Sequence, residues 1–359
     1  MIESSSQAPF AAGIIEGFFG QPWSFATRKA YAGFLRKAGL NRYIYAPKDD
    51  AWLRKKWDQP FPAAHAAELK SLGVHLRQEG VHFGIGLSPF ELYRDFSASR
   101  QSKLQAKIEA INAIGPQILC ILFDDMSGDL DGLARQQIAI MDFVQRHSSA
   151  DEFLLCPTYY SSDPRLEKLF GSSPHNYLEE LGAQLSPDIG IFWTGPQIIS
   201  TSYPTEHLAE LAERLQRRPV LWDNYPVNDA ERLCHILHLK PAERSAELCS
   251  SSAGLYANPM NQAWLSQLPL YALAQQLRGA STDKEALFRE ACTALCAPPL
   301  ATALQEDAAL FQEQGLQQIT APAKALLLDK YRALQPSPMA QEVIDWLQGN
   351  YHFDPSCLS

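Results

Sequence analysis

The sequence lacks the patterns that mark several large classes of protein. Its seven cysteines form no CxxC pair, so nothing indicates a zinc site. No lysine and arginine run exceeds three residues, and the formal net charge of −9 argues against nucleic-acid or membrane partners. No apolar run reaches the roughly 20 residues of a membrane-spanning helix, and no signal peptide is visible. We therefore expect a cytoplasmic protein without a metal or other cofactor.

A glycine-rich phosphate loop is missing as well. Gly13, Gly17 and Gly20 have the wrong spacing for one, and Pro22 follows them at once. What the chain does contain is a regular alternation of strand-like runs with helical stretches, the pattern of parallel βα units. The strand-like runs are 13–20, 43–48, 81–87, 118–123, 153–160, 189–194, 219–224 and 254–258. The helical stretches are 24–39, 63–80, 99–114, 131–147, 205–217, 229–239 and 260–278.

Eight such units predict an α/β fold in which a (β/α)8 TIM barrel covers residues 13–280. An open, doubly wound sheet is the alternative, and the missing phosphate loop disfavours it. Residues 1–12 form a Ser-rich lead-in to the barrel. Residues 281–359 have helical periodicity without strand signals, which predicts a helical C-terminal region that packs on the barrel or forms a homodimer.

The candidate chemistry lies where the predicted strands end, because barrels carry their active sites at that end. Asp124 and Asp125 directly follow the apolar run Ile118–Phe123. The other strands end mostly in polar or aromatic residues, namely Glu16, Gly17, Lys48, Asp49, Asp50, Ser88, Tyr159, Tyr160, Trp193, Thr194, Trp222, Asp223, Asn224 and Asn258. Amides, carboxylates and flat rings suit a sugar, whereas a phosphorylated ligand would need arginine or a glycine nest.

Two carboxylates are the usual tools of glycoside hydrolysis. Adjacent residues on one strand end are poorly placed to flank a bond from opposite sides. Asp124 and Asp125 fit better with a substrate whose own 2-acetamido oxygen is the nucleophile, one carboxylate orienting the acetamide and the other protonating the leaving oxygen. Close like charges also push the two pKa values apart.

Less reactive interpretations of the same residues exist. One aspartate of the pair could cap a helix while the other is a solvated charge, or both could join Asp129 and Asp131 in a magnesium site. A barrel that binds such a 2-acetamido sugar without catalysis is a further alternative. Asn224 and Asp229 could cap the predicted helix 229–239. Glu16, one residue before the strand end, could be a buried partner of Lys48.

Seven motifs in order along the chain resemble the catalytic domain of glycoside hydrolase family 84, the β-N-acetylglucosaminidases that include protein O-GlcNAcases and bacterial hyaluronidases. They are GIIEGFFGQPW (13–23), YIYAPKDD (43–50), ILFDDM (121–126), CPTYY (156–160), WTGP (193–196), WDNYPVND (222–229) and ANP (257–259). The resemblance covers about residues 10–280. It implies a metal-independent, retaining exo-hydrolase that releases terminal β-linked GlcNAc from a glycoconjugate through an oxazoline.

The resemblance also implies roles for individual residues. Asp124 would polarise the acetamide and stabilise the oxazoline, and Asp125 would serve as general acid and then as base. Lys48 and the backbone of Gly17 would bind sugar hydroxyls. Tyr160 would steady the acetamide.

The remaining sugar contacts would come from Trp222, as a wall of the pocket, and from Asn224, Asp229 and Asn258. Asp229 would lie on the side of the 4- and 6-hydroxyls. The chain departs from the family at Phe19, where a tyrosine is usual, and the loop after Tyr160 has no aromatic residue that could contact an aglycone.

Overall fold

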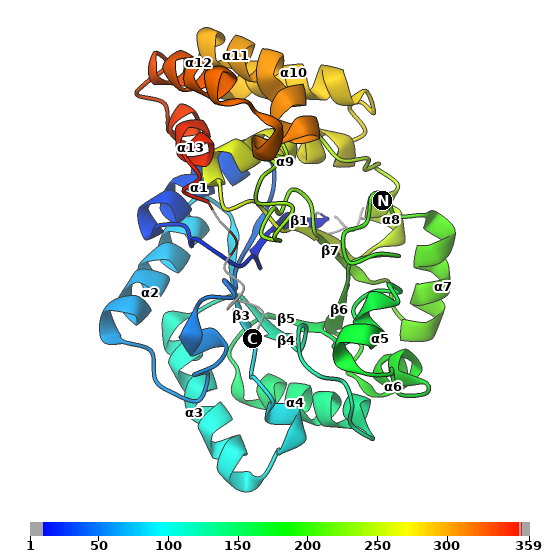
Figure 1. Cartoon of the computed structure of the whole chain (residues 1–359). Helices are drawn as coiled ribbons and strands as arrows, with labels where there is room; N and C mark the ends of the chain where they lie inside the picture. The colour runs from blue at the N-terminus through cyan, green and yellow to red at the C-terminus, as the bar shows by residue number, and fades with distance from the viewer. Residues whose placement is uncertain (1–9, 352, 354–359) are drawn as a thin grey trace, which may run out of the picture.

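The computed structural model describes residues 10–351 and 353. Eight parallel strands close into a barrel in the order of the chain, which confirms the predicted (β/α)8 fold (Figure 1). The strands are β1 (Ala11–Glu16), β2 (Arg42–Tyr45), β3 (His82–Leu87), β4 (Ile118–Leu122), β5 (Glu152–Cys156), β6 (Ile189–Trp193), β7 (Val220–Asp223) and β8 (Gly254–Ala257). The pairing of β1 with both β2 and β8 closes the barrel. Most of the predicted lead-in over residues 1–12 lies outside the described residues.

Helices surround the barrel where the sequence patterns place most of them. They are α1 (Phe25–Ala38), α2 (Ala63–Gln78), α3 (Ala98–Ile114), α4 (Leu133–His147), α5 (Arg165–Phe170), α6 (Tyr177–Gln184), α7 (Thr205–Leu215), α8 (Leu248–Ser251) and α9 (Ala263–Leu277). Helix α1 has the predicted boundaries. Ser24 accepts a hydrogen bond from the backbone N–H of Thr27, and Gly39 ends the helix in the left-handed conformation (φ +74°).

One predicted helix does not form. Residues 229–239 make turns, and their backbone groups bond to the C-terminal region: Leu237 N donates to the Phe311 carbonyl (3.2 Å) and Leu239 N to Gln312 Oε1 (2.9 Å). These tertiary hydrogen bonds replace those that a helix would make within itself. The alternative in which Asn224 and Asp229 cap this helix is therefore wrong. Conversely, α5 and α6 were not predicted, because both are short.

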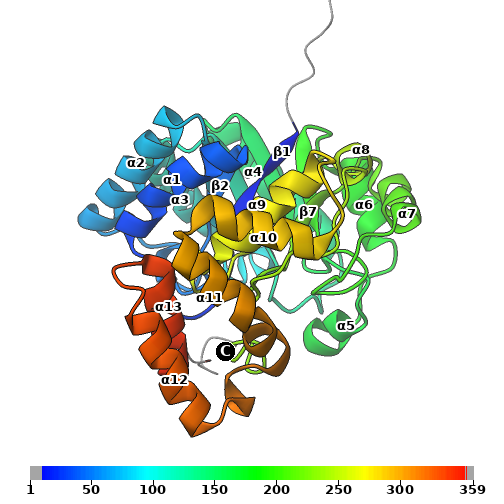
Figure 2. The ribbon, with the colours of Figure 1, turned by 90° about the horizontal axis from the view of Figure 1, so that it is seen from above.

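The C-terminal region is helical, as the periodicity predicts. It contains α10 (Lys284–Leu295), α11 (Pro298–Ala309) with a π-helical turn η3 (Leu310–Gln314), α12 (Ala321–Arg332) and α13 (Pro338–Leu347). Figures 1 and 2 show these helices gathered on one side of the barrel, against α9. They enclose a second apolar core, which includes Phe311, Tyr331 and Trp346 and is shared with Leu265 and Leu268 of α9. The domain boundary at residue 280 and a homodimer through this region stay predictions.

Glu342 of α13 joins the C-terminal region to the barrel. Glu342 is 8% exposed, and its carboxylate accepts hydrogen bonds from Trp264 N (3.0 Å) and Leu265 N (2.8 Å). These two residues are in the first turn of α9, which has no cap from its own sequence. A carboxylate there satisfies free N–H groups and interacts favourably with the helix dipole. Burial nevertheless raises the pKa of Glu342 to about 8, because it outweighs the two backbone donors.

Glu342→Gln is expected to weaken the pH dependence of stability. A folded-state pKa above the ordinary value means that the folded protein binds this proton more tightly than the unfolded chain. The stability from this group is therefore greatest below the ordinary pKa near 4.5 and is lost as the pH rises toward 8. The free energy of unfolding should therefore fall less between pH 5 and pH 8 in the variant than in the wild type, by roughly 1 to 3 kcal/mol. Urea unfolding at pH 5 and pH 8 measures the difference.

The matched control is Glu313→Gln, because the Glu313 side chain is 65% exposed on the same region. This control should keep the wild-type difference between pH 5 and pH 8. An unchanged difference in Glu342→Gln as well would show that Glu342 titrates near its ordinary pKa in the folded protein.

Among the described residues, no helix combines the length and apolar character needed to span a lipid bilayer. The cytoplasmic location stays a prediction.

Candidate active site

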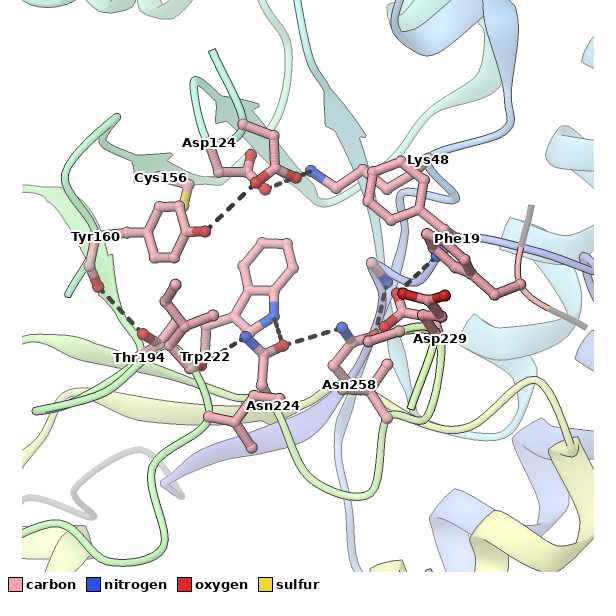
Figure 3. A pocket seen from close by; sticks show the side chains of 18 residues that line it. Phe19, Lys48, Asp124, Cys156, Tyr160, Thr194, Trp222, Asn224, Asp229 and Asn258 are labelled. Carbon is pink, nitrogen blue, oxygen red and sulfur yellow. Dashed lines mark hydrogen bonds and ion pairs between the residues drawn. The ribbon is translucent and has the colours of Figure 1, made fainter. Parts of the chain in front are cut away.

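A cavity of about 310 Å³ opens at the end of the barrel where the strands terminate (Figure 3). This size is typical of sites for small molecules. All nine residues predicted for the site line it, namely Gly17, Lys48, Asp124, Asp125, Tyr160, Trp222, Asn224, Asp229 and Asn258. They come from six strand ends that are far apart in the sequence, and closure of the barrel brings them together.

The two aspartates follow β4 and differ in environment. Asp124 is buried (6% exposed), whereas the Asp125 side chain is 31% exposed. Asp125 has a positive φ of 57°, a conformation that aspartate tolerates better than most residues. This backbone turn lets two consecutive side chains reach the same cavity, although neighbouring residues of a straight strand point to opposite faces.

Lys48, which follows β2, is the cation that holds the pair. Its ammonium contacts Asp124 Oδ2 directly and lies 3.4 Å from Asp125 Oδ2. Burial alone would lower the pKa of Lys48, but the two carboxylates raise it overall, so the side chain is charged. Burial raises the pKa of Asp124 as well, the charge of Asp125 adds to this effect, and Lys48 opposes it.

One carboxylate oxygen of Asp124 has no hydrogen-bond partner among the described residues. Asp124 Oδ2 is bound to Lys48, but Asp124 Oδ1 is fully buried and accepts no hydrogen bond from the described residues. An unsatisfied buried acceptor is costly and calls for a donor. This oxygen therefore marks a position in the cavity where a ligand N–H or O–H group would bind.

Tyr160, Cys156 and Thr194 form one side of the cavity, at the ends of β5 and β6. The Tyr160 hydroxyl donates to Asp125 Oδ1 over 3.4 Å, and burial holds the Tyr160 pKa well above its ordinary value. The tyrosine is therefore a neutral donor. Thr194 N donates to the Tyr160 carbonyl (2.9 Å) and fixes the backbone of this side.

Side-chain amides form the floor beside the Trp222 ring. Trp222 Nε1 and Asn258 Nδ2 both donate to Asn224 Oδ1, over 2.9 and 3.0 Å. Asn258 Oδ1 in turn accepts from the backbone N–H of Gly17 (3.1 Å). A side chain at Gly17 would collide with the Trp222 ring, because an added Cβ would lie 2.2 Å from it. Glycine is required here by this close approach.

Asp229 stands on the side opposite Tyr160, next to Phe19 (Figure 3). Its Oδ2 accepts a hydrogen bond from the backbone N–H of Phe19 (2.9 Å). Burial raises the pKa of Asp229 to about 6, although this backbone donor opposes the shift. A carboxyl group that titrates near pH 6 is therefore part of the cavity wall.

The predicted partner of Lys48 is wrong. Glu16 is fully buried but faces α1, where it forms a bidentate ion pair with Arg28 (2.8 and 2.9 Å). Asp223 likewise faces away from the cavity and pairs with Arg244 over 2.7 Å. The alternation of side chains along a strand explains Asp223, since its neighbours Trp222 and Asn224 face the cavity. Ser88, Tyr159 and Trp193 are also absent from the cavity lining.

The cavity also contains residues that were not predicted for the site. They are Cys156, Ile198, Ile199, Val227, Ala230, Glu231 and Phe353; Phe19 and the strand-end residue Thr194 line the cavity as well. Cys156 begins the motif CPTYY at a strand end, so its position could have indicated it. Phe353 comes from the end of the C-terminal region and has no local sequence signal.

The magnesium alternative requires acidic residues to converge. Asp129 and Asp131 are exposed, and in the described part of the chain no group of three or more His, Cys, Asp or Glu side chains is arranged to hold a metal ion.

Comparison with known proteins identifies the family. The beta-N-acetylglucosaminidase (NAGidase) family profile matches residues 12–311. The chain is 32% identical over 276 residues to the Protein O-GlcNAcase of Rattus norvegicus and, over 279 residues, to that of Mus musculus. Each match covers 74% of this chain but only 30% of the relative. A mutant of the Thermobaculum terrenum O-GlcNAc hydrolase superposes with a TM-score of 0.78 at 31% identity, covering 95% of this chain and 81% of the other.

The fold and the cavity are thus those of a barrel with paired carboxylates at its strand ends. The chain belongs to the β-N-acetylglucosaminidase family, glycoside hydrolase family 84, as the motifs indicate. It spans about 30% of the length of the curated relatives that it matches.

Proposed function

We propose that this protein is a retaining exo-β-N-acetylglucosaminidase of the O-GlcNAcase type, which removes terminal β-linked GlcNAc from a glycoconjugate by substrate-assisted catalysis. The observation that carries the proposal is the buried Oδ1 of Asp124 beside Asp125, which accepts no hydrogen bond from any described residue. An acetamide N–H is a donor that suits this oxygen. The names of the relatives, O-GlcNAcase and O-GlcNAc hydrolase, support the same substrate class.

In the first step Asp124 accepts a hydrogen bond from the N–H of the 2-acetamido group. The acetamide oxygen then attacks C1, and the bond from C1 to the leaving oxygen breaks. Asp125 gives its proton to that oxygen. The products of this step are the free aglycone, an ionised Asp125 and a positively charged, N-protonated oxazoline on the sugar, whose N–H stays hydrogen-bonded to Asp124.

In the second step Asp125 acts as the base. It removes a proton from a water molecule that attacks C1, the bond between C1 and the acetamide oxygen breaks, and GlcNAc leaves with its β configuration retained. Tyr160 donates to the oxazoline side of the sugar, and Lys48 keeps Asp124 oriented. Lys48 and Asn258 contact the sugar hydroxyls, with Asp229 on the side of the 4- and 6-hydroxyls.

The direct test is hydrolysis of an aryl β-N-acetylglucosaminide by the wild type, with and without EDTA. The proposal predicts turnover that EDTA does not change and GlcNAc released as the β anomer, which NMR detects. Turnover that EDTA abolishes would favour the magnesium alternative. Binding of GlcNAc without turnover would point to a sugar-binding barrel instead.

The proposal also predicts a pH dependence of substrate binding. Asp229 titrates near pH 6, and only its ionised form accepts hydrogen bonds from two sugar hydroxyls. KM should therefore fall as the pH rises from 5 to 7. Asp229→Asn should raise KM at pH 7 by about 10- to 100-fold, the usual effect of losing a hydrogen bond to a charged group. It should also remove this pH dependence of KM.

Glu243→Gln is the control for this prediction, because Glu243 is an exposed carboxylate of the same segment between β7 and β8 and does not line the cavity. Its KM should keep the wild-type dependence on pH. If Asp229→Asn kept that dependence too, a different group would be responsible for it.

A further inference from the structure

Phe353 connects the C-terminal region to the cavity. Of the described residues that line the cavity, it alone comes from outside the barrel and its loops. Its side chain is half-buried. Figure 2 shows that α12 and α13 extend toward the end of the barrel at which β1 terminates, which is the end that carries the cavity. Phe353, which follows α13 in the chain, therefore lies near the mouth.

Two hydrogen bonds to Cys234, one to its carbonyl and one to its thiol, hold Trp346 and Phe353 in place. The Trp346 indole N–H donates to the Cys234 carbonyl over 3.2 Å. The backbone N–H of Phe353 donates to the Cys234 thiol; burial of the thiol raises its pKa, and this donor opposes the rise. Tyr351 packs against the apolar core of the C-terminal helices. Phe353 is thus fixed to the loop that follows β7.

The same loop places Phe353 on one side of the cavity. Cys234 N bonds to the Ala230 carbonyl (2.9 Å), and Ala230 and Glu231 line the cavity directly after Asp229. Asp229 is bonded to Phe19 and lies opposite Tyr160. The wall that contains Phe353 is therefore the wall of Asp229, away from the acetamide side.

We propose that Phe353 closes the non-reducing side of the sugar pocket and thereby restricts the protein to terminal GlcNAc with unsubstituted 4- and 6-hydroxyls. The inference rests on the proposed function, in which Asp229 binds these hydroxyls. An aromatic ring beside a carboxylate gives the C4–C6 edge of the sugar an apolar face to pack on. A group attached to O6 or O4 would have to occupy the space of this ring.

The test compares two free sugars, GlcNAc and 6-O-methyl-GlcNAc, by calorimetry, and the aryl β-glycosides of both by kcat/KM. The wild type should prefer the unsubstituted sugar strongly. Phe353→Ala should reduce this preference by on the order of tenfold, because removal of the ring makes room for the methyl group. Phe353→Tyr should keep the wild-type preference.

Leu326→Ala is the matched control, because Leu326 of α12 is an apolar side chain in the same region that is 73% exposed. Its preference should equal that of the wild type. An unchanged preference in Phe353→Ala, or an equal loss of affinity for both sugars, would overturn the inference and leave the proposed function intact. Failure of the wild type to bind GlcNAc would overturn both.

Discussion

Asp124→Asn is expected to lower kcat for aryl β-N-acetylglucosaminides by about 10²- to 10³-fold, the usual cost of removing one preorganised electrostatic contact at a reacting centre. The asparagine keeps the size of the side chain but loses the negative charge that balances Lys48 and stabilises the positive charge on the oxazoline. The loss should be similar for good and poor leaving groups, because Asp124 assists the attack of the acetamide in every case. Steady-state rates with a series of aryl leaving groups measure it.

A second series isolates the role of the acetamide. Fluorination of the acetyl group weakens its oxygen as a nucleophile, so wild-type kcat should fall steadily from the acetyl to the trifluoroacetyl substrate. Asp131→Asn is the matched control for the Asp124→Asn variant, since Asp131 is an exposed aspartate of the loop that follows β4. It should retain wild-type rates. Rates that do not respond to fluorination would contradict attack by the substrate.

Asp125→Asn is expected to have an effect that depends on the leaving group. Without a general acid, a poor leaving group such as an alkyl alcohol must depart unprotonated, which costs about 10²- to 10⁴-fold in rate. An activated aryl leaving group needs little protonation, so its first step should be nearly spared. The slope of log(kcat/KM) against leaving-group pKa should therefore be steeper in the variant than in the wild type.

The second step gives an independent readout for Asp125. Because the same carboxylate activates water, the variant should accumulate the oxazoline with activated substrates, and a strong small nucleophile such as azide should restore turnover as a β-glycosyl azide. Equal losses across all leaving groups, together with no rescue by azide, would assign Asp125 to a structural role.

Much of the architecture follows from local pattern. The alternation of short apolar runs with helical stretches predicts parallel βα units, since strands buried on both faces are apolar throughout and amphipathic helices cover them. The two ends of α1 were also predictable from local sequence, because capping by Ser24 and Gly39 depends only on neighbouring residues. The helix predicted over residues 229–239 does not form, because the structure there depends on distant residues. Its hydrogen bonds go to Phe311 and Gln312, which no local pattern can indicate.

Part of the candidate site was likewise predictable from local sequence, and part was not. Because every strand of a parallel barrel ends at the same rim, residues at strand ends such as Lys48, Asp124 and Trp222 can be expected to meet from the order of the strands alone. Local sequence did not indicate which of two neighbours faces inward. Asp223 is as polar as Asn224, yet it pairs with Arg244 behind the sheet.

The sequence by itself thus determined the barrel, the rim of polar and aromatic residues and the paired aspartates, because all of these depend on short-range order along the chain. Only the tertiary structure decided that Glu16 forms its ion pair with Arg28 and not with Lys48. The same holds for the lack of a partner for Asp124 Oδ1 among the described residues and for the position of Phe353 in the cavity lining. Each of these features depends on how segments distant in the sequence pack against one another. That packing is determined by burial and charge balance in three dimensions.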